Sequence, residues 1–269
     1  MLRLVQMEAL MKKLPVLFLL VIGLTFLIPP KVKATPALNQ DIIQIDYATG
    51  LGFRYLQRTL TWDDAEQTSP LKASILTAQF AFSTDFGVTL TPFIGLVFQS
   101  FDNLVFRQLP LSVELETGNI SGWIFGGDLT WEAIEYANFS VGLKGEFLYS
   151  LGNTNNWSIP GLMVEGKLQG KPNWWEARLG PLCFYQGWDT FTPFIWTGIS
   201  PLQGTFSLEE TIETLHRTED KEIKGKGNFF VSLGTNLNFS PLRMRVCLDL
   251  FPSKDNLDPG VTIQIFYVF

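Results

Sequence analysis

The side chain best suited to acid–base catalysis is His216, the only histidine in the 269-residue chain. It lies in the polar segment 215–220, whose residues could orient an imidazole at the expected edge between a strand and a loop. Hydrolysis by such a base needs a nucleophile within hydrogen-bond reach. No serine lies two residues from His216. We therefore predict that the chain has no catalytic residue and is not an enzyme.

The two cysteines, Cys183 and Cys247, could in principle bind a metal or form a disulfide. A typical zinc site needs four Cys or His ligands, more than two separated cysteines and one histidine supply. A disulfide needs a Cα separation of about 5.5–6 Å. In the strands expected below, Cys183 lies on an apolar face and Cys247 on a polar face of distant strands. We expect two free thiols, no metal site and no cofactor.

The composition restricts the class of protein. Hydrophobic residues make up 46% of the chain and charged residues 17%, with 23 phenylalanines. Disordered chains combine low hydrophobicity with high net charge, so this chain is expected to fold. The formal net charge is −6 and no basic block appears, which argues against a nucleic-acid partner.

Residues 1–34 have the pattern of a signal peptide. Lys12 and Lys13 precede an apolar stretch at 14–28, and Val32 and Ala34 are small residues at the −3 and −1 positions of a cleavage site. The apolar stretch is shorter than the roughly 20 residues that span a membrane, which disfavours the alternative of a retained anchor. We expect cleavage after Ala34, which leaves one domain at 35–269.

The elements that position the remaining polar residues are expected to be strands with two different faces. Four segments, 43–58, 139–151, 231–239 and 242–250, alternate with period two between large apolar residues and small, polar or charged ones. Glycine recurs on the polar face, which suits the crowded interior of a narrow barrel. No apolar run after residue 34 is long enough for a transmembrane helix. A membrane-inserted chain without such helices must form a closed β-barrel.

Turn-like breaks divide the chain into about twelve strands. Short breaks at 84–87, 135–138, 170–173, 200–204 and 239–241 alternate with longer ones at 61–70, 100–118, 152–159, 186–191, 216–227 and 252–259. The strands are expected near 43–60, 71–83, 88–99, 120–134, 139–151, 160–169, 174–185, 192–199, 205–215, 228–239, 242–251 and 260–269. If 205–215 is an external excursion, the count falls to ten, and eight would require several long loops.

The last strand carries the most specific pattern. One face of residues 260–269 is apolar or aromatic at every second position and ends in phenylalanine: Val261, Ile263, Ile265, Tyr267 and Phe269. In this the sequence resembles the bacterial outer-membrane β-barrel proteins. The resemblance implies location in the bacterial outer membrane, insertion by the barrel-assembly machinery through this strand, and closure of 260–269 on 43–58. A soluble periplasmic β-protein is the alternative, and heat-modifiable gel migration would separate the two.

The same resemblance implies tryptophan and tyrosine belts at the two membrane interfaces. Five tryptophans lie near expected strand ends: Trp62, Trp131, Trp174, Trp175 and Trp188. The alternative is that these side chains simply fill space.

The polar faces place thirteen charged residues in the lumen: Asp46, Arg54, Asp128, Glu132, Lys144, Glu146, Glu165, Lys167, Glu209, Glu213, Arg243, Arg245 and Asp249. Unpaired charges are costly in a low-dielectric interior, so opposite charges should pair across it. Small barrels are filled by side chains, whereas open pores have mostly 16–18 strands. We therefore favour a constricted, charge-paired lumen and a structural or passive role. A narrow porin-like channel for small solutes is the alternative, and a hydrolase at the barrel rim is less favoured.

Two expected loops could contact other molecules. The 100–118 loop is unusually apolar and could fold over the barrel mouth. In the 216–227 loop, Lys221, Lys224 and Lys226 could contact lipopolysaccharide phosphates, although a solvated hairpin tip is the simpler interpretation. Outer-membrane lipids and lipopolysaccharide are thus the expected surroundings. The sequence indicates neither a solute nor an oligomeric state.

Overall fold

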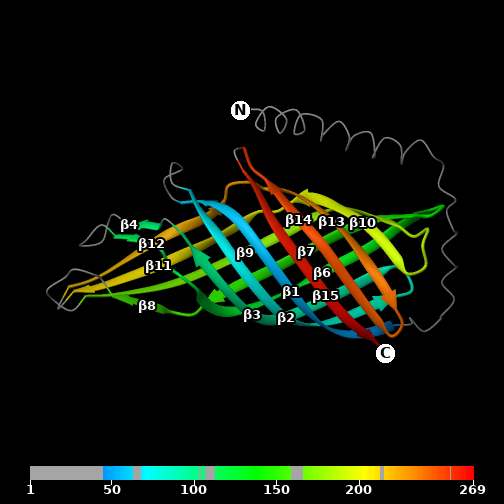
Figure 1. The fold of residues 1–269 in the computed structure, drawn as a ribbon, viewed down its shortest axis with the longest axis horizontal. Coiled ribbons are helices and arrows are strands. Elements are labelled where there is room, and N and C mark those ends of the chain that lie inside the picture. Colours follow the sequence, from blue (N-terminus) through cyan, green and yellow to red (C-terminus); the bar gives the residue numbers. More distant parts are fainter. Residues whose placement is uncertain are drawn as a thin grey trace.

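The computed structural model describes residues 45–62, 68–102, 104–106, 113–158, 166–212, 215–254 and 256–269. The expected signal peptide, residues 1–34, lies outside the described residues. The described part contains no helix that could cross a membrane. Its regular structure consists of β-strands, and ten of them close into one antiparallel ring (Figure 1), which confirms the predicted all-β closed barrel.

The ring is formed in chain order by β1 (Ile45–Thr61), β2 (Thr68–Thr84), β3 (Val88–Phe101), β6 (Ile120–Tyr136), β7 (Phe139–Gly152), β9 (Gly166–Tyr185), β10 (Phe191–Ile199), β13 (Phe229–Phe239), β14 (Leu242–Pro252) and β15 (Leu257–Val268). β15 pairs with β1 from Ala48 opposite Val268 to Leu56 opposite Gly260. The predicted closure between 260–269 and 43–58 is therefore confirmed, and it leaves neither strand as an open edge of the ring.

The ring has ten strands, the first of the two alternative counts, rather than twelve. The expected strands at 160–169 and 174–185 are parts of one strand, β9, because the expected turn at 170–173 does not form. β8 (Asn155–Ser158) pairs with β9 up to Gly170, and β7 pairs with it from Asn173. Pro172 falls in the interval between these two ladders, where a residue without an N–H is tolerated.

The other expected strand, 205–215, lies in a hairpin outside the ring. β11 (Leu202–Ile212) pairs with β12 (Leu215–Gly225) on one side and with Gly166–Glu176 of β9 on the other. β12 reaches β1 only through two residue pairs, Leu60 with Gly225 and Thr61 with Lys224. We call β8, β11, β12 and residues 166–173 of β9 the extension; it projects beyond the barrel in Figure 1. Most of the expected 216–227 loop is thus strand β12.

The two ends of the barrel differ in their connections. Short turns join β2 to β3, β6 to β7, β9 to β10 and β13 to β14, at the end where β1 begins and β15 finishes; we call this the short-turn end. The opposite, loop end carries the extension and a separate two-stranded sheet, β4 (Leu104–Phe106) and β5 (Val113–Leu115), within the expected 100–118 loop. The connection at 186–191, expected to be a long loop, lies at the short-turn end.

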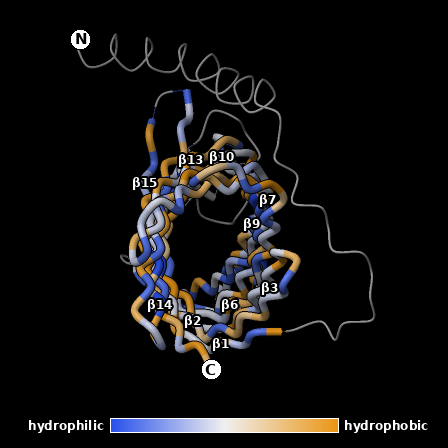
Figure 2. The backbone as a smooth tube through the Cα atoms, turned by 90° about the vertical axis from the view of Figure 1, so that its right-hand side faces the viewer, coloured by the Kyte–Doolittle hydropathy of each residue, from blue (hydrophilic) through white to orange (hydrophobic). Residues whose placement is uncertain are grey.

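The strands alternate as expected between an outer apolar and an inner polar face. Figure 2 shows the ring end-on. On β15, Ile263, Ile265 and Tyr267 are exposed on the outer surface, whereas Thr262 and Gln264 are buried inside. The same outer surface carries large exposed side chains on β3, β6 and β7. An exposed apolar wall on every side is the arrangement of a barrel that faces hydrocarbon rather than water.

The tryptophans do not all follow the expected belts. Trp131 and Trp188 are about half exposed on the outside, but Trp62 and Trp174 are buried. Trp174 lies on the inner face of β9, and its indole Nε1 donates a hydrogen bond of 2.5 Å to Oε1 of Gln99. The expected belt position of Trp174 was wrong because the inner face of β9 also carries large apolar side chains.

Candidate functional site: the barrel lumen

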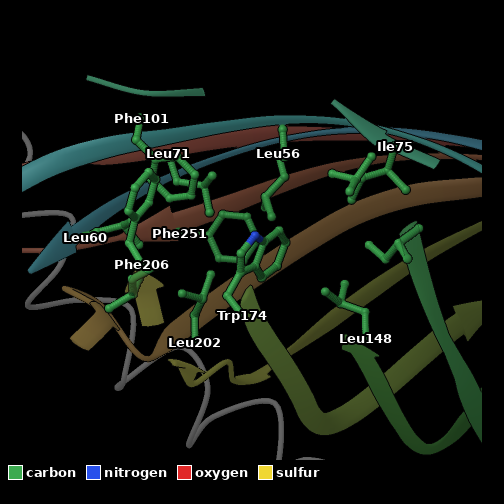
Figure 3. Packing of buried hydrophobic residues seen from close by; sticks show 14 of the residues in the cluster. Leu56, Leu60, Leu71, Ile75, Phe101, Leu148, Trp174, Leu202, Phe206 and Phe251 are labelled. Atoms are coloured by element: carbon green, nitrogen blue, oxygen red, sulfur yellow. The ribbon is translucent and has the colours of Figure 1, made fainter. Parts of the chain in front are cut away.

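The loop end of the lumen is filled by apolar side chains, which we call the apolar plug. Phe101 of β3 and Phe206 of β11 meet edge to face with ring centroids 5.4 Å apart. Because β11 belongs to the extension, the extension supplies part of the plug. The plug consists of fully or almost fully buried residues from five ring strands and β11 (Figure 3): Leu56, Leu60, Leu71, Phe101, Trp174, Leu202, Phe206 and Phe251.

Next to the plug lies an ion-pair layer of six buried side chains: Arg54, Arg58, Glu146, Glu176, Arg178 and Asp249. Arg58 of β1 donates hydrogen bonds to Glu176 of β9 and to Oγ of Ser200 at 2.9 Å. β1 and β9 are five strands apart in either direction around the ring, so this ion pair crosses the lumen from one wall to the opposite wall. The guanidinium of Arg58 also lies 4.3 Å from the ring centroid of Phe251.

A second ion pair crosses the lumen beside the first. The guanidinium of Arg54 on β1 donates two hydrogen bonds to the carboxylate of Glu146 on β7, at 2.5 and 2.9 Å. This two-bond geometry is the strongest arrangement of an arginine with a carboxylate. Nε of Arg54 donates a third bond to Oγ1 of Thr262 at 3.2 Å, which orients the guanidinium.

Arg178 of β9 connects Glu176 with the third carboxylate, Asp249. Its guanidinium lies 3.1 Å from Glu176 and 3.3 Å from Asp249 of β14. Asp249 also accepts hydrogen bonds from the hydroxyls of Ser232 and Thr262. The layer therefore holds three arginines and three carboxylates, and each charge has a partner, as burial requires.

The short-turn end of the lumen is hollow. A cavity of about 640 Å³, which we call the polar cavity, opens there. Asp128 at its wall forms an ion pair with Lys144 at 3.6 Å. Nε of Arg245 donates to Oδ1 of Asn236 at 2.7 Å. The wall combines apolar residues with ten charged or amide side chains: Asp46, Asp128, Glu132, Asp189, Arg243, Arg245, Gln186, Asn236, Asn238 and Gln264.

The thirteen residues predicted for the lumen divide into four groups. Arg54, Glu146 and Asp249 belong to the ion-pair layer. Asp46, Asp128, Glu132, Arg243 and Arg245 line the polar cavity, with Lys144 next to Asp128. Glu165 and Glu213 lie outside the described residues. The remaining two are not in the lumen, because their side chains are exposed on the extension: Lys167 and Glu209.

The assignment of Lys167 and Glu209 to the lumen was wrong for two different reasons. Lys167 lies on the part of β9 that extends beyond the ring. On β11 the buried side chains include Phe206, Leu208 and Glu210, so Glu209 points to the opposite face. In a strand, a shift of one residue moves a side chain to the other face.

Sequence reasoning missed three members of the ion-pair layer: Arg58, Glu176 and Arg178. Arg58 could have been found, because it lies four residues after Arg54 on the same strand. An even spacing places both side chains on the same face. Glu176 and Arg178 were harder to find, because the same face of β9 carries Trp174, Leu182 and Phe184, which are all buried. A face with so many large apolar residues has the composition of a lipid-facing one.

Among the other candidate residues, His216 lies apart from the lumen network, whereas Sγ of Cys247 lies 3.4 Å from Oδ1 of Asp249 in the ion-pair layer. His216 is exposed on the extension, with Nδ1 3.0 Å from Oγ1 of Thr211 across the hairpin. Cys183 of β9 and Cys247 of β14 are free, and β10 and β13 separate their strands in the ring. Among the described residues, no cluster of three or more His, Cys, Asp or Glu side chains could hold a metal ion.

The lysines of β12 have acidic neighbours on their own strand. Lys221 is largely buried, with Nζ 3.5 Å from Glu219. Nζ of Lys224 donates a 2.7 Å hydrogen bond to Glu222, and this bond lowers the pKa of that exposed carboxyl. The exposed ammonium of Lys224 is therefore paired with the carboxylate of Glu222.

No protein-family model matches the chain, and no curated protein matches it in sequence. Solved structures with a similar fold include the outer membrane protease OmpT from Escherichia coli, with 11% identity over 85% of this chain and 99% of that chain and a TM-score of 0.48. They also include the translocator domain of the autotransporter NalP from Neisseria meningitidis, with 13% identity over 83% and 88% of the two chains and a TM-score of 0.45. These neighbours are bacterial outer-membrane β-barrels, and the likeness concerns the fold alone.

Proposed function

We propose that the protein spans the bacterial outer membrane as a ten-stranded barrel and has a structural or passive role. The support is the closed ring, which pairs the strand backbones, together with the apolar outer wall. We further propose that the barrel-assembly machinery recognises the C-terminal segment 260–269 through Val261, Ile263, Ile265, Tyr267 and Phe269. We also propose that outer-membrane lipids and lipopolysaccharide surround the barrel. The loop end, with its extension, then faces the cell exterior.

The observation that best supports a passive role is that two ion pairs cross the lumen. Arg54–Glu146 and Arg58–Glu176 connect β1 with β7 and with β9. Their side chains occupy the middle of a ring of only ten strands, and the apolar plug fills the loop end beside them. An ion that crossed the barrel would have to separate buried charges and enter a packed apolar layer, both of which are costly. The lumen is therefore closed to ions.

Conductance in planar lipid bilayers tests this proposal. The purified full-length protein is expected to give no stable conductance steps. A variant that lacks residues 103–116, and with them the β4–β5 sheet, is expected to remain closed, because all six side chains of the ion-pair layer come from ring strands. A stable open channel in most insertions of the unaltered protein would contradict the proposal.

The second candidate function, a narrow channel for small solutes, is favoured by one observation. The polar cavity already opens the lumen at the short-turn end over about 640 Å³. For ions or solutes to pass, the apolar plug would then have to move. The ion pairs would either stay in place or move with it. In the same bilayer experiment, steps in the unaltered protein would support the channel, and steps only after deletion of 103–116 would indicate a gated channel.

A further inference from the structure

The two opposite walls of the polar cavity carry opposite charge. β6 contributes Asp128 and Glu132, and β14 contributes Arg243 and Arg245. β6 and β14 are five strands apart in both directions around the ten-stranded ring, so they face each other across the lumen. Asp46 of β1 and Asp189 of the β9–β10 turn add further acidic groups to the wall. The cavity is thus polarised across its width.

The basic wall has capacity for an anionic group. In the part of the chain that the structure describes, neither Arg243 nor Arg245 forms an ion pair with a carboxylate. Arg245 is nevertheless held in place, because its Nε donates to Asn236 and its guanidinium lies 5.6 Å from the ring centroid of Phe194. An oriented guanidinium with free N–H groups is well suited to bind a carboxylate through two hydrogen bonds.

The acidic wall has capacity for a cationic group. The carboxylate of Glu132 accepts hydrogen bonds from Oγ of Ser140 at 2.9 Å and from Nε2 of Gln186 at 3.4 Å. These neutral donors orient the carboxylate and leave its charge uncompensated, and no cation contacts it among the described residues. Asp128, in contrast, is partly neutralised by Lys144. Glu132 is therefore the group on this wall that best fits an ammonium.

We propose that the polar cavity binds a small zwitterion, a dipeptide, with its ammonium at Glu132 and its carboxylate at Arg243 and Arg245. A ligand of one charge would satisfy one wall and leave the other unpaired, whereas a zwitterion satisfies both. The volume of about 640 Å³ lies within the range of small-molecule sites. Phe184 and Trp188 at the same cavity offer apolar surface to a ligand side chain.

The plug determines how the ligand enters. Because the loop end is filled, the zwitterion reaches the cavity from the short-turn end, which faces the periplasm in the proposed orientation. The site goes beyond the proposed function and does not depend on a closed lumen, since all its groups lie on the short-turn side of the ion-pair layer. Conductance and binding can therefore fail independently.

Calorimetric titration of the full-length protein in detergent micelles tests the proposal with three probes. Alanyl-alanine carries both charges, N-acetyl-alanyl-alanine lacks the ammonium, and alanyl-alanine amide lacks the carboxylate. A charged hydrogen bond contributes enough free energy that alanyl-alanine should bind roughly tenfold more tightly than either analogue. Equal affinity for the three peptides, or no binding of alanyl-alanine by the folded barrel, would overturn the proposal.

Two variants assign the two walls. Arg245→Gln should weaken alanyl-alanine and the N-acetyl peptide roughly tenfold and leave the amide unchanged, while Glu132→Gln should weaken alanyl-alanine and the amide and leave the N-acetyl peptide unchanged. Glu222→Gln on the extension is the matched control and should change nothing. Heat-modifiable migration verifies that each barrel is folded, and Arg243→Gln replaces Arg245→Gln if the latter does not fold. Equal losses for all three peptides in both variants would refute the assigned orientation.

Discussion

The same ten ring strands line both ends of the lumen, with β11 added at the loop end, yet the two ends are opposite in character. At the loop end Leu60, Phe101 and Phe206 are buried together in one apolar cluster. At the short-turn end they carry Glu132 and Arg245 around about 640 Å³ of open space. The ion-pair layer separates the two. The inner face of this barrel is therefore not one environment, and the polar cavity opens at the short-turn end.

The difference also separates stability from binding. Side chains in the plug and in the ion-pair layer are buried and fully packed, so their loss should destabilise the barrel. Arg243 at the wall of the polar cavity is exposed, so loss of its charge should leave stability almost unchanged. Three substitutions along the lumen test this gradient through the free energy of unfolding in urea, measured in phospholipid vesicles.

The largest effect is expected in the ion-pair layer. Arg178→Ala removes the partner of Asp249 and one partner of Glu176, and it leaves buried negative charge without compensation. Loss of one member of a buried ion pair costs roughly 3–5 kcal/mol. The midpoint of urea unfolding, followed by tryptophan fluorescence, should fall accordingly. A change below about 1 kcal/mol would mean that water or rearranged side chains already solvate this layer.

An intermediate effect is expected in the plug. Leu60 is fully buried, and Leu60→Ala should cost about 3 kcal/mol through lost burial and the cavity left behind. The same substitution at Leu51, a lipid-facing residue that is 70% exposed, is the matched control on the same strand. Equal losses at the two positions would contradict a packed loop end.

The smallest effect is expected at the polar cavity. Arg243 is exposed at the cavity wall, and Arg243→Gln should change the free energy of unfolding by no more than about 0.5 kcal/mol in either direction. The same variant should weaken binding of alanyl-alanine, so stability and binding are measured on one protein. A loss of stability as large as that of Arg178→Ala would remove the distinction between the two halves of the lumen.

Much of the barrel wall could be predicted because it follows from local patterns. The alternation in 43–58 identified Arg54 as an inward residue and Phe53 as an outward one, and the apolar face of 260–269 identified the closing strand. Strand number was harder, because Gly170 and Pro172 have the composition of a turn but lie within β9. A proline indicates where a ladder bond is missing and does not indicate whether the chain reverses.

The candidate site was only partly predictable for a different reason. The sequence indicated that Arg54, Glu146 and Asp249 point inward, but no pattern within a strand indicates which charges meet. Arg54 and Glu146 are 92 residues apart in the chain, and Arg58 and Glu176 are 118 apart. The extension was also invisible as such, because β11 and β12 alternate much as wall strands do.

The amino-acid sequence alone thus determined the class of fold, the closing strand and, on most strands, the side of the wall to which a residue belongs. These properties depend on near neighbours in the chain, through the two-residue period of a strand. The tertiary structure decided the ten-stranded ring, the plug at one end, the ion pairs across the middle and the polarised cavity at the other end. Those features depend on how many strands close the ring and how they are staggered, which sets the side chains that meet across the lumen.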